Sequence, residues 1–216
     1  MKSIIDIKTS NQNIEYFDAL NFMEKKVDKI LCNEENEMLW FLNHHHIYTC
    51  GTSSNRNEIL SKTNIPILQT NRGGKTTYHG PGQRIVYFMI NLNKRKKDIR
   101  KFVSIIENSV ISLLKEFGIE AITFPERVGI WVIKSQGNKL SKEKKIGAIG
   151  LRIRKWVAYH GLSFNIDPDL KFYENINACG LKNYSSTSLK NLNINLSDKE
   201  FDKNFKKNFD NNILQL

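Results

Sequence analysis

The chain has 216 residues, of which 40% are hydrophobic and 10% aromatic, and this excludes a chain that is disordered throughout. No apolar run reaches the roughly 18 residues of a membrane-spanning helix, and the N-terminus lacks the features of a signal peptide. The three cysteines, Cys32, Cys50 and Cys179, are too few and odd in number for a secreted disulfide framework, so we expect a cytoplasmic protein with no membrane partner.

The formal net charge of +11 is compatible with a nucleic-acid-binding surface, but the residue types favour other interpretations. The chain has 25 lysines and 25 asparagines against eight arginines, whereas a phosphate-binding surface would more often favour arginine. A general compositional bias toward Lys and Asn is the first interpretation, an acidic protein partner the second, and nucleic acid the third. The charge alone therefore assigns no function.

The N-terminal half predicts one helix followed by short strands. Apolar residues recur near helical spacing over residues 13–32, with Phe17 on the apolar face. Short apolar runs then predict strands, and the polar stretch between them predicts a loop. In chain order these are a strand at 37–43, a loop at 49–64, and strands at 65–70 and 84–92.

The second half begins with the clearest helix, at 98–119, which Asp98 can cap and Gly118 can end. Four strands follow, and the polar, lysine-rich residues 135–145 predict a hairpin connection between the second and the third. The strands are predicted at 121–124, 129–134, 146–153 and 157–166. Phenylalanines at helical spacing after Ser197 predict a C-terminal helical tail over 197–216.

This succession of elements predicts the fold class. Strands in hairpin-like order with two or three helices indicate an α+β fold with a mainly antiparallel or mixed sheet flanked by helices. There is no internal repeat, and no linker divides the chain. We therefore expect a single domain over residues 1–216.

The segment "RGGKTTYHGPGQ" (72–83) contains four of the chain's twelve glycines. A tight connection between strands is the simplest explanation, because glycine adopts positive φ angles without strain. A second explanation is a site where backbone N–H groups approach a ligand, with a few polar side chains at its rim. The spacing matches neither a P-loop nor a dinucleotide-binding fingerprint, so phosphate binding is not indicated.

Three segments in this order resemble the signature motifs of the lipoyl(octanoyl) transferases, which share the biotin/lipoate protein ligase fold. They are "RGGKTTYHGPGQ", "KIGAIGLRIRKWVAYHGLSFNID" (145–167) and "NACGLKNYSSTSL" (177–189), with a looser match at "NHHHIYTCG" (43–51). The resemblance extends over about residues 39–190. It implies a cytoplasmic acyltransferase of lipoate biosynthesis that needs no cofactor.

The reaction that the resemblance implies passes an octanoyl group through a thioester on Cys179. The donor would be octanoyl-acyl carrier protein, and the acceptor a lysine of lipoyl domains, in 2-oxoacid dehydrogenase complexes and in the glycine cleavage H protein. Lys145 would face the nucleophile, lower the pKa of its thiol and act as general acid and base. An adjacent ammonium is useful because an ordinary thiol is only a few per cent thiolate at neutral pH.

The residue types alone do not single out this pair. A lone cysteine is more often a small buried hydrophobe than a nucleophile, and a lysine within "KEKK" is ordinarily a solvated charge. Their assignment as catalytic residues therefore depends on the resemblance. We also expect backbone N–H groups between Ala148 and Gly150 to bind the oxyanion of the tetrahedral intermediates.

The resemblance further implies substrate contacts from three stretches of the chain. They are Arg72, Gly73, Gly74, Lys75, Thr76, Thr77, Tyr78 and His79; Ala148, Ile149 and Gly150; and His160, Gly161 and Leu162. The chain departs from the family pattern at Lys75, where Gln or Asp is usual, at Ala178, where Pro is usual, and at Arg84, where an apolar residue is common. Asn43-His44-His45 stands where a Glu-His-Pro type of sequence is expected.

The histidine run His44-His45-His46 suggests a metal site at first sight. Successive side chains of a strand point to opposite faces, so three adjacent histidines make a poor chelate and we expect no metal. Three alternative functions remain open from the sequence: a lipoate or biotin protein ligase, a lipoyl amidotransferase, and a basic nucleic-acid-binding module. The transferase motifs favour octanoyl transfer with no nucleic-acid partner.

Overall fold

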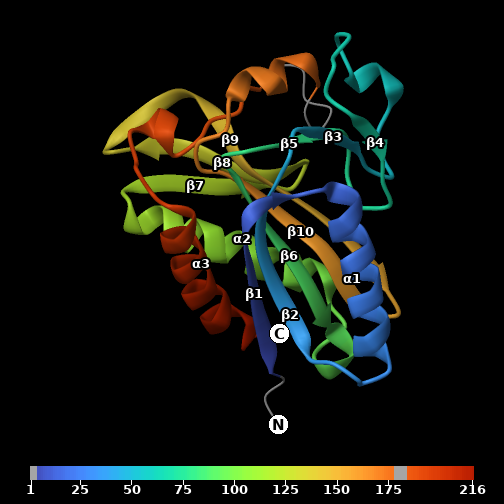
Figure 1. Ribbon diagram of the computed structural model, residues 1–216. Helices are drawn as coiled ribbons and strands as arrows, with labels where there is room; N and C mark the ends of the chain where they lie inside the picture. The colour runs from blue at the N-terminus through green and yellow to red at the C-terminus, as the bar shows by residue number, and fades with distance from the viewer. Residues whose placement is uncertain (1–3, 178–183) are drawn as a thin grey trace.

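The framework of the protein is a seven-stranded sheet with helices on both faces, seen in a computed structural model that describes residues 4–177 and 184–216 (Figure 1). The strand order is β1-β2-β6-β10-β9-β8-β7, and all neighbours are antiparallel except β1 and β2. The strands are β1 (Ile5–Ile14), β2 (Glu37–His44), β6 (Gln83–Asn91), β7 (Ile119–Phe124), β8 (Arg127–Ser135), β9 (Asn138–Arg154) and β10 (Val157–Asn165).

A smaller sheet of order β4-β3-β5 stands beyond one end of the large one. Its strands are β3 (Ile47–Cys50), β4 (Ile67–Gln69) and β5 (Thr77–His79). The α-helices of the described residues are α1 (Tyr16–Leu31), α2 (Ile99–Glu116) and α3 (Asp198–Ile213), and the 3-10 turns are η1 (Arg56–Glu58), η2 (Leu92–Lys94), η3 (Leu170–Asn175) and η5 (Lys190–Leu192). The α+β class with a mainly antiparallel sheet is as predicted.

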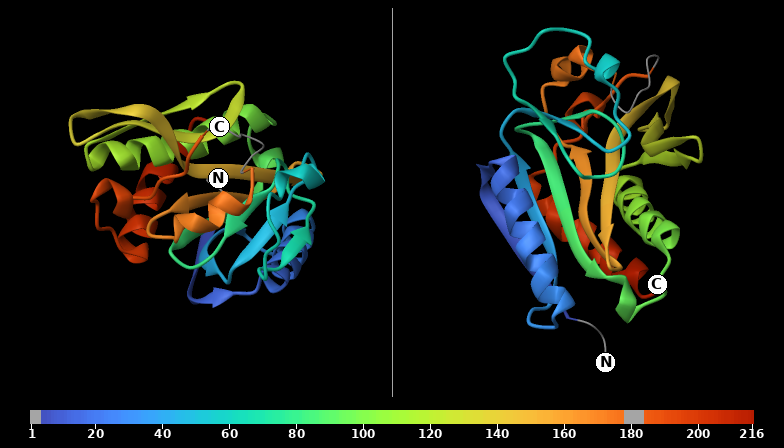
Figure 2. Two further views of the ribbon diagram at one scale, coloured as in Figure 1. Left: turned by 90° about the horizontal axis from the view of Figure 1, so that it is seen from above. Right: turned by 90° about the vertical axis from the view of Figure 1, so that its right-hand side faces the viewer.

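The central strand β6 divides the core into two layers because its side chains alternate between the faces of the sheet. Ile85, Tyr87 and Met89 pack in a cluster with α1. Val86 and Phe88 pack in a larger cluster with α2 and α3. Figure 2 shows α1 on one side of the sheet and the other two helices on the opposite side. Every residue of β6 is therefore buried.

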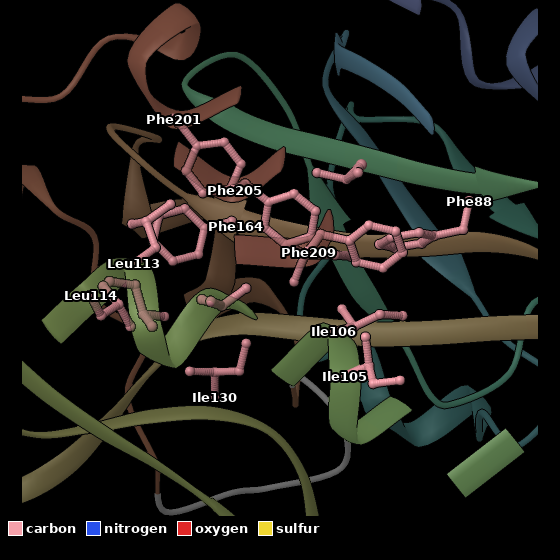
Figure 3. Packing of buried hydrophobic residues seen from close by; sticks show 14 of the residues in the cluster. Phe88, Ile105, Ile106, Leu113, Leu114, Ile130, Phe164, Phe201, Phe205 and Phe209 are labelled. Atoms are coloured by element: carbon pink, nitrogen blue, oxygen red, sulfur yellow. The ribbon is translucent and has the colours of Figure 1, made fainter. Parts of the chain in front are cut away.

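Helix α3 is held to the sheet by a column of phenylalanines. Phe201, Phe205 and Phe209 recur every four residues, so they share one helix face, and their rings stack at centroid distances of 5.8 and 5.9 Å (Figure 3). Ser197 and Glu200 form a capping box at the start of the helix. The predicted tail helix is confirmed. No helix within the described part of the chain is long and apolar enough to span a membrane.

One strand was not predicted from the sequence, and two expectations are wrong. Residues 5–14 form an edge strand that the sequence did not indicate, because their apolar residues are few and irregularly spaced. The polar stretch 135–145 is mostly strand, since β8 and β9 continue as a hairpin whose outer part has no core to cover. Phe17 was assigned to the buried face of its helix, but it is 62% exposed.

Arg84 explains two departures from the family pattern at once. Its guanidinium, 3% exposed, makes two parallel hydrogen bonds to the Asp202 carboxylate, at 2.8 and 2.6 Å. It also donates to the side-chain oxygen of Asn43, whose amide donates to Asp198. Burial raises the pKa of the Asp202 carboxyl, and the Arg84 charge opposes that rise. The residues at 43 and 84 therefore form one polar connection between the sheet and α3.

We predict that Arg84→Met destabilises the fold by about 3–5 kcal/mol, because it leaves Asp202 partly buried without its cation. The double variant Arg84→Met/Asp202→Leu should recover most of that loss. Lys190→Met, which removes an ion pair whose two side chains are exposed, is the control and should cost less than about 1 kcal/mol. Urea denaturation measures all three, and a double variant no more stable than the single one would contradict this assignment.

Candidate active site

A cavity of about 550 Å³ lies between the glycine-rich segment and strands β9 and β10. Its size is typical of small-molecule sites. All three predicted stretches contribute to its wall, together with residues that no sequence pattern indicated. The principal additions are Tyr16, Tyr87, Ile99, Val103, Arg127 and Val128. Lys145 lies on the same wall.

On one side of the cavity, the backbone of the glycine-rich segment lies in direct contact with the backbone of β9. The Gly73 N–H donates to the Leu151 carbonyl at 3.0 Å, which places the glycine-rich segment on the edge of β9. A Cβ atom on Gly150 would lie 2.8 Å from the Gly73 oxygen, and one on Gly73 would lie 2.7 Å from the Leu151 oxygen. Side chains at either glycine would separate the segment from the strand.

Arg72 holds the glycine-rich segment in place. Its guanidinium donates to the Thr49 carbonyl at 2.6 Å, to the Thr49 hydroxyl and to the Lys75 carbonyl at 2.8 Å. These bonds connect strand β3 to both sides of the turn at Gly74, which has a φ angle of +87°. The fork of donors in arginine makes several such bonds at once, which a lysine could not do.

The residues of 72–79 do not all face the cavity. In β5, Thr77 and His79 line it, while Tyr78 points to the other face, where its hydroxyl pairs with His46 at 2.7 Å. The Thr76 N–H donates to the Glu58 carboxylate at 2.8 Å, and its side chain is buried away from the cavity. The side chains of Thr76 and Tyr78 therefore take no part in the cavity wall.

His160, predicted to bind substrate, lies on the cavity wall in an unusual backbone conformation. Its φ angle is +61°, a left-handed value that costs a non-glycine residue free energy and often marks a functional site. Its Nε2–H donates to the Asn71 side-chain oxygen at 3.0 Å, because the Asn71 amide itself donates to Glu24. The Nδ1 atom is then a bare acceptor, with no hydrogen-bond partner within the described residues.

His79 presents a second bare nitrogen. The Gln83 amide donates to Asn165 and Tyr173, so its oxygen accepts from His79 Nδ1–H at 2.7 Å. This arrangement leaves His79 Nε2 as an acceptor without a partner in the described part of the chain. The cavity wall thus presents two imidazole rings, those of His79 and His160.

A third histidine, His44, does not line the cavity but contacts Tyr87, which does. Its Nδ1–H donates to the Ile14 carbonyl at 2.7 Å, and the Tyr87 hydroxyl donates to its Nε2 at 2.7 Å. Burial lowers the pKa of His44 to about 4 and that of His160 to about 3, and it holds the pKa of His79 well below its ordinary value. All three rings are therefore uncharged at neutral pH.

Lys145 enters the site from β9 with its ammonium buried, at 7% exposure. Its Nζ donates to the Val128 carbonyl at 2.9 Å and lies 5.5 Å from the centre of the Trp131 ring. The side chain passes directly over Gly129, where a Cβ atom would lie 2.3 Å from the lysine Cε. Unlike an ordinary lysine in a "KEKK" run, this one points into the protein.

Cys179 lies outside the described residues, but the chain on both sides of it is placed. Asn177 donates its N–H to the Glu58 carbonyl at 2.7 Å. Lys145 donates its backbone N–H to the Ser185 carbonyl and accepts from the Thr187 N–H, so residues 185–187 run beside Lys145. Of the other cysteines, Cys50 is buried, and Cys32 is exposed at the end of α1.

The three adjacent histidines diverge. His44 is buried against Tyr87, His45 is exposed, and His46 pairs with Tyr78. Among residues 4–177 and 184–216, no three His, Cys, Asp or Glu side chains are gathered as a metal site would require.

Lys75 lies half-exposed at the rim of the cavity, 3.7 Å from Glu58.

We predict that the protein loses stability as the pH falls from about 6.5 toward 4. In that range the unfolded chain protonates its histidines while folded His44 stays neutral, so protons favour the unfolded state. His44→Gln should remove a part of this acid sensitivity that reaches about 3 kcal/mol near pH 4. Urea denaturation at a series of pH values measures it. His45→Gln, at an exposed position, is the control, and equal sensitivity in the two variants would contradict the prediction.

Comparisons with known proteins show similarity over most of the chain. The family model of the lipoyl protein ligase A/B catalytic domain matches residues 15–210. An octanoyltransferase of Bartonella tribocorum is 43% identical over 87% of this chain and 78% of its own length. One of Zymomonas mobilis is 45% identical over 91% of this chain and 89% of its own length.

Solved structures show the same fold at lower sequence identity. A bi-partite lipoate protein ligase from Thermoplasma acidophilum superimposes with a TM-score of 0.69 at 14% identity, covering 99% of this chain and 84% of that one. The likeness to ligases is thus one of fold, whereas the relatives with high sequence identity carry the name of a transferase. The chain belongs to the lipoyl protein ligase A/B catalytic domain family, among its octanoyltransferases.

Proposed function

We propose that this chain transfers an octanoyl group from octanoyl-acyl carrier protein to a lysine of lipoyl domains, through a thioester on Cys179. The acyltransferase activity in lipoate biosynthesis follows from its octanoyltransferase relatives. The route through Cys179 and Lys145, and the identity of donor and acceptors, are the proposal. We include among the acceptors the lipoyl domains of 2-oxoacid dehydrogenase complexes and the glycine cleavage H protein.

The observation that carries the proposal is the position of Lys145. It is a buried amine on the wall of a mostly apolar cavity, and its backbone is hydrogen-bonded to the segment that follows Cys179. Burying an ammonium costs free energy, so such a lysine needs a reason to be there. A charge that favours the thiolate form of a neighbouring cysteine, and later accepts a proton, is such a reason.

The first half-reaction loads the enzyme. The Cys179 thiolate attacks the carbonyl carbon of the octanoyl thioester, the bond between that carbon and the donor sulfur breaks, and the donor leaves as a thiol with a proton supplied by Lys145. In the second half-reaction the acceptor amine attacks the new thioester and gives its proton to Lys145. The bond to Cys179 then breaks, leaving an octanoyl amide and the free enzyme.

The edge of β9 supplies a donor for the oxyanion of each tetrahedral intermediate. The Leu151 carbonyl faces away from β10, toward Gly73, and alternate residues of a strand direct their polar backbone groups to the same side. The Ile149 N–H therefore faces the same edge of β9. Strand β8 pairs with this edge only as far as Gly147, so it does not cover Ile149. We assign it to the oxyanion, within the stretch 148–150 that the sequence indicated.

We predict that incubation with octanoyl-loaded carrier protein gives an enzyme adduct, detectable by mass spectrometry and labile to hydroxylamine. The adduct should be absent in Cys179→Ala and present in Cys32→Ala and Cys50→Ala, because the resemblance to the family assigns the nucleophile to Cys179. An unchanged adduct in Cys179→Ala would overturn the assignment of the nucleophile.

We predict that Lys145→Gln slows both half-reactions by about 10²-fold or more, which is the usual contribution of a general acid or base. Lys144→Gln, an exposed neighbour on the same strand, is the control and should keep normal rates. Rapid-quench measurement of acylation and transfer tests this, with circular dichroism to verify folding. Wild-type rates in Lys145→Gln would remove the proposed role.

A further inference from the structure

The cavity opens beside the first turn of α2, where apolar side chains reach the surface. Ile99 is 38% exposed and Val128 is 57% exposed, and both line the cavity. Val103, Ile149 and Leu151 lie beside them, half-buried on the same wall. An apolar surface that continues into an apolar cavity favours the entry of an apolar chain.

A run of cations borders this entrance. Lys96, Lys97, Arg100 and Lys101 are all exposed, immediately before and within the first turn of α2. Asp98, the one acid among them, is engaged as the helix cap, accepting from the Lys101 backbone N–H. Across the described parts of the chain, none of these four cations forms an ion pair. We name these four residues the basic edge.

The surroundings of the basic edge keep it positive although Asp98 carries a negative charge there. The N-terminus of α2 adds the positive end of the helix dipole at the same place. Lys97 lies 5.8 Å from the centre of the exposed Trp156 ring, which holds its ammonium near this surface. Such a surface attracts an acidic partner and accelerates its encounter.

We infer that the basic edge is the docking site of the acyl donor, a carrier protein that presents an acidic face and carries the octanoyl chain on a flexible arm. This inference rests on the proposed function. The donor must deliver an apolar chain into the cavity, so it has to dock where apolar surface leads inward. The acceptor brings only a lysine amine to the thioester and needs no apolar entrance.

The test reverses two charges of the basic edge without touching the cavity wall. In Arg100→Glu/Lys101→Glu, acidic residues enter the first turn of a helix, where the dipole favours them, so the fold should be kept. The matched control is Lys199→Glu/Lys203→Glu, which makes the same charge change at the start of α3, away from the cavity. Acylation is measured with octanoyl-carrier protein and with the small thioester octanoyl-N-acetylcysteamine.

We expect kcat/KM for the carrier-bound donor to fall about tenfold or more in Arg100→Glu/Lys101→Glu, mainly through KM, and the difference to shrink at 0.5 M salt. The small thioester should react at the wild-type rate in both variants. An undiminished rate with the carrier would overturn the inference, as would an equal loss with both donors.

Transfer from pre-acylated enzyme to a lipoyl domain distinguishes the acceptor from the donor. If Arg100→Glu/Lys101→Glu slows this step and not acylation, the basic edge docks the acceptor, and the inference is wrong. Failure of the proposed function has a different signature, because wild-type enzyme would then form no adduct with either donor.

Discussion

The active-site cavity depends on a contact between two stretches of backbone. Because Gly73 and Gly150 carry no side chains, the glycine-rich segment lies directly on the part of β9 that β8 leaves unpaired. Arg72 secures the other side of that segment to β3. The backbone of these two glycines therefore forms part of the cavity wall, and a side chain at either position would separate the segment from the strand.

The sequence predicted the elements whose signals are local. Helices α2 and α3 follow from apolar periodicity and caps at Asp98 and Ser197, and the structure confirms both. The outer part of β9 could not be predicted, because a strand pair that covers no core has the composition of a loop. Tyr16 and Tyr87 reach the cavity from α1 and β6, which the fold brings together from distant parts of the chain, so no spacing could indicate them.

Three neutral histidine rings lie on or behind the cavity wall. His44, His79 and His160 each give their one N–H to a fixed acceptor, so each ring has a defined tautomer. Burial keeps them neutral. Lys145, another cation of the cavity wall, is hydrogen-bonded through its backbone to Ser185 and Thr187.

The Arg84 network has a consequence for chimeras made from this chain and a homologue. Arg84 lies on a central strand, Asn43 on a neighbouring strand, and their acidic partners on the last helix, more than a hundred residues later. In a homologue with an apolar residue at the position of Arg84, acids at the positions of Asp198 and Asp202 would have no arginine to pair with. A chimera joined between β10 and α3 would therefore separate Arg84 and Asn43 from the two acids that they contact.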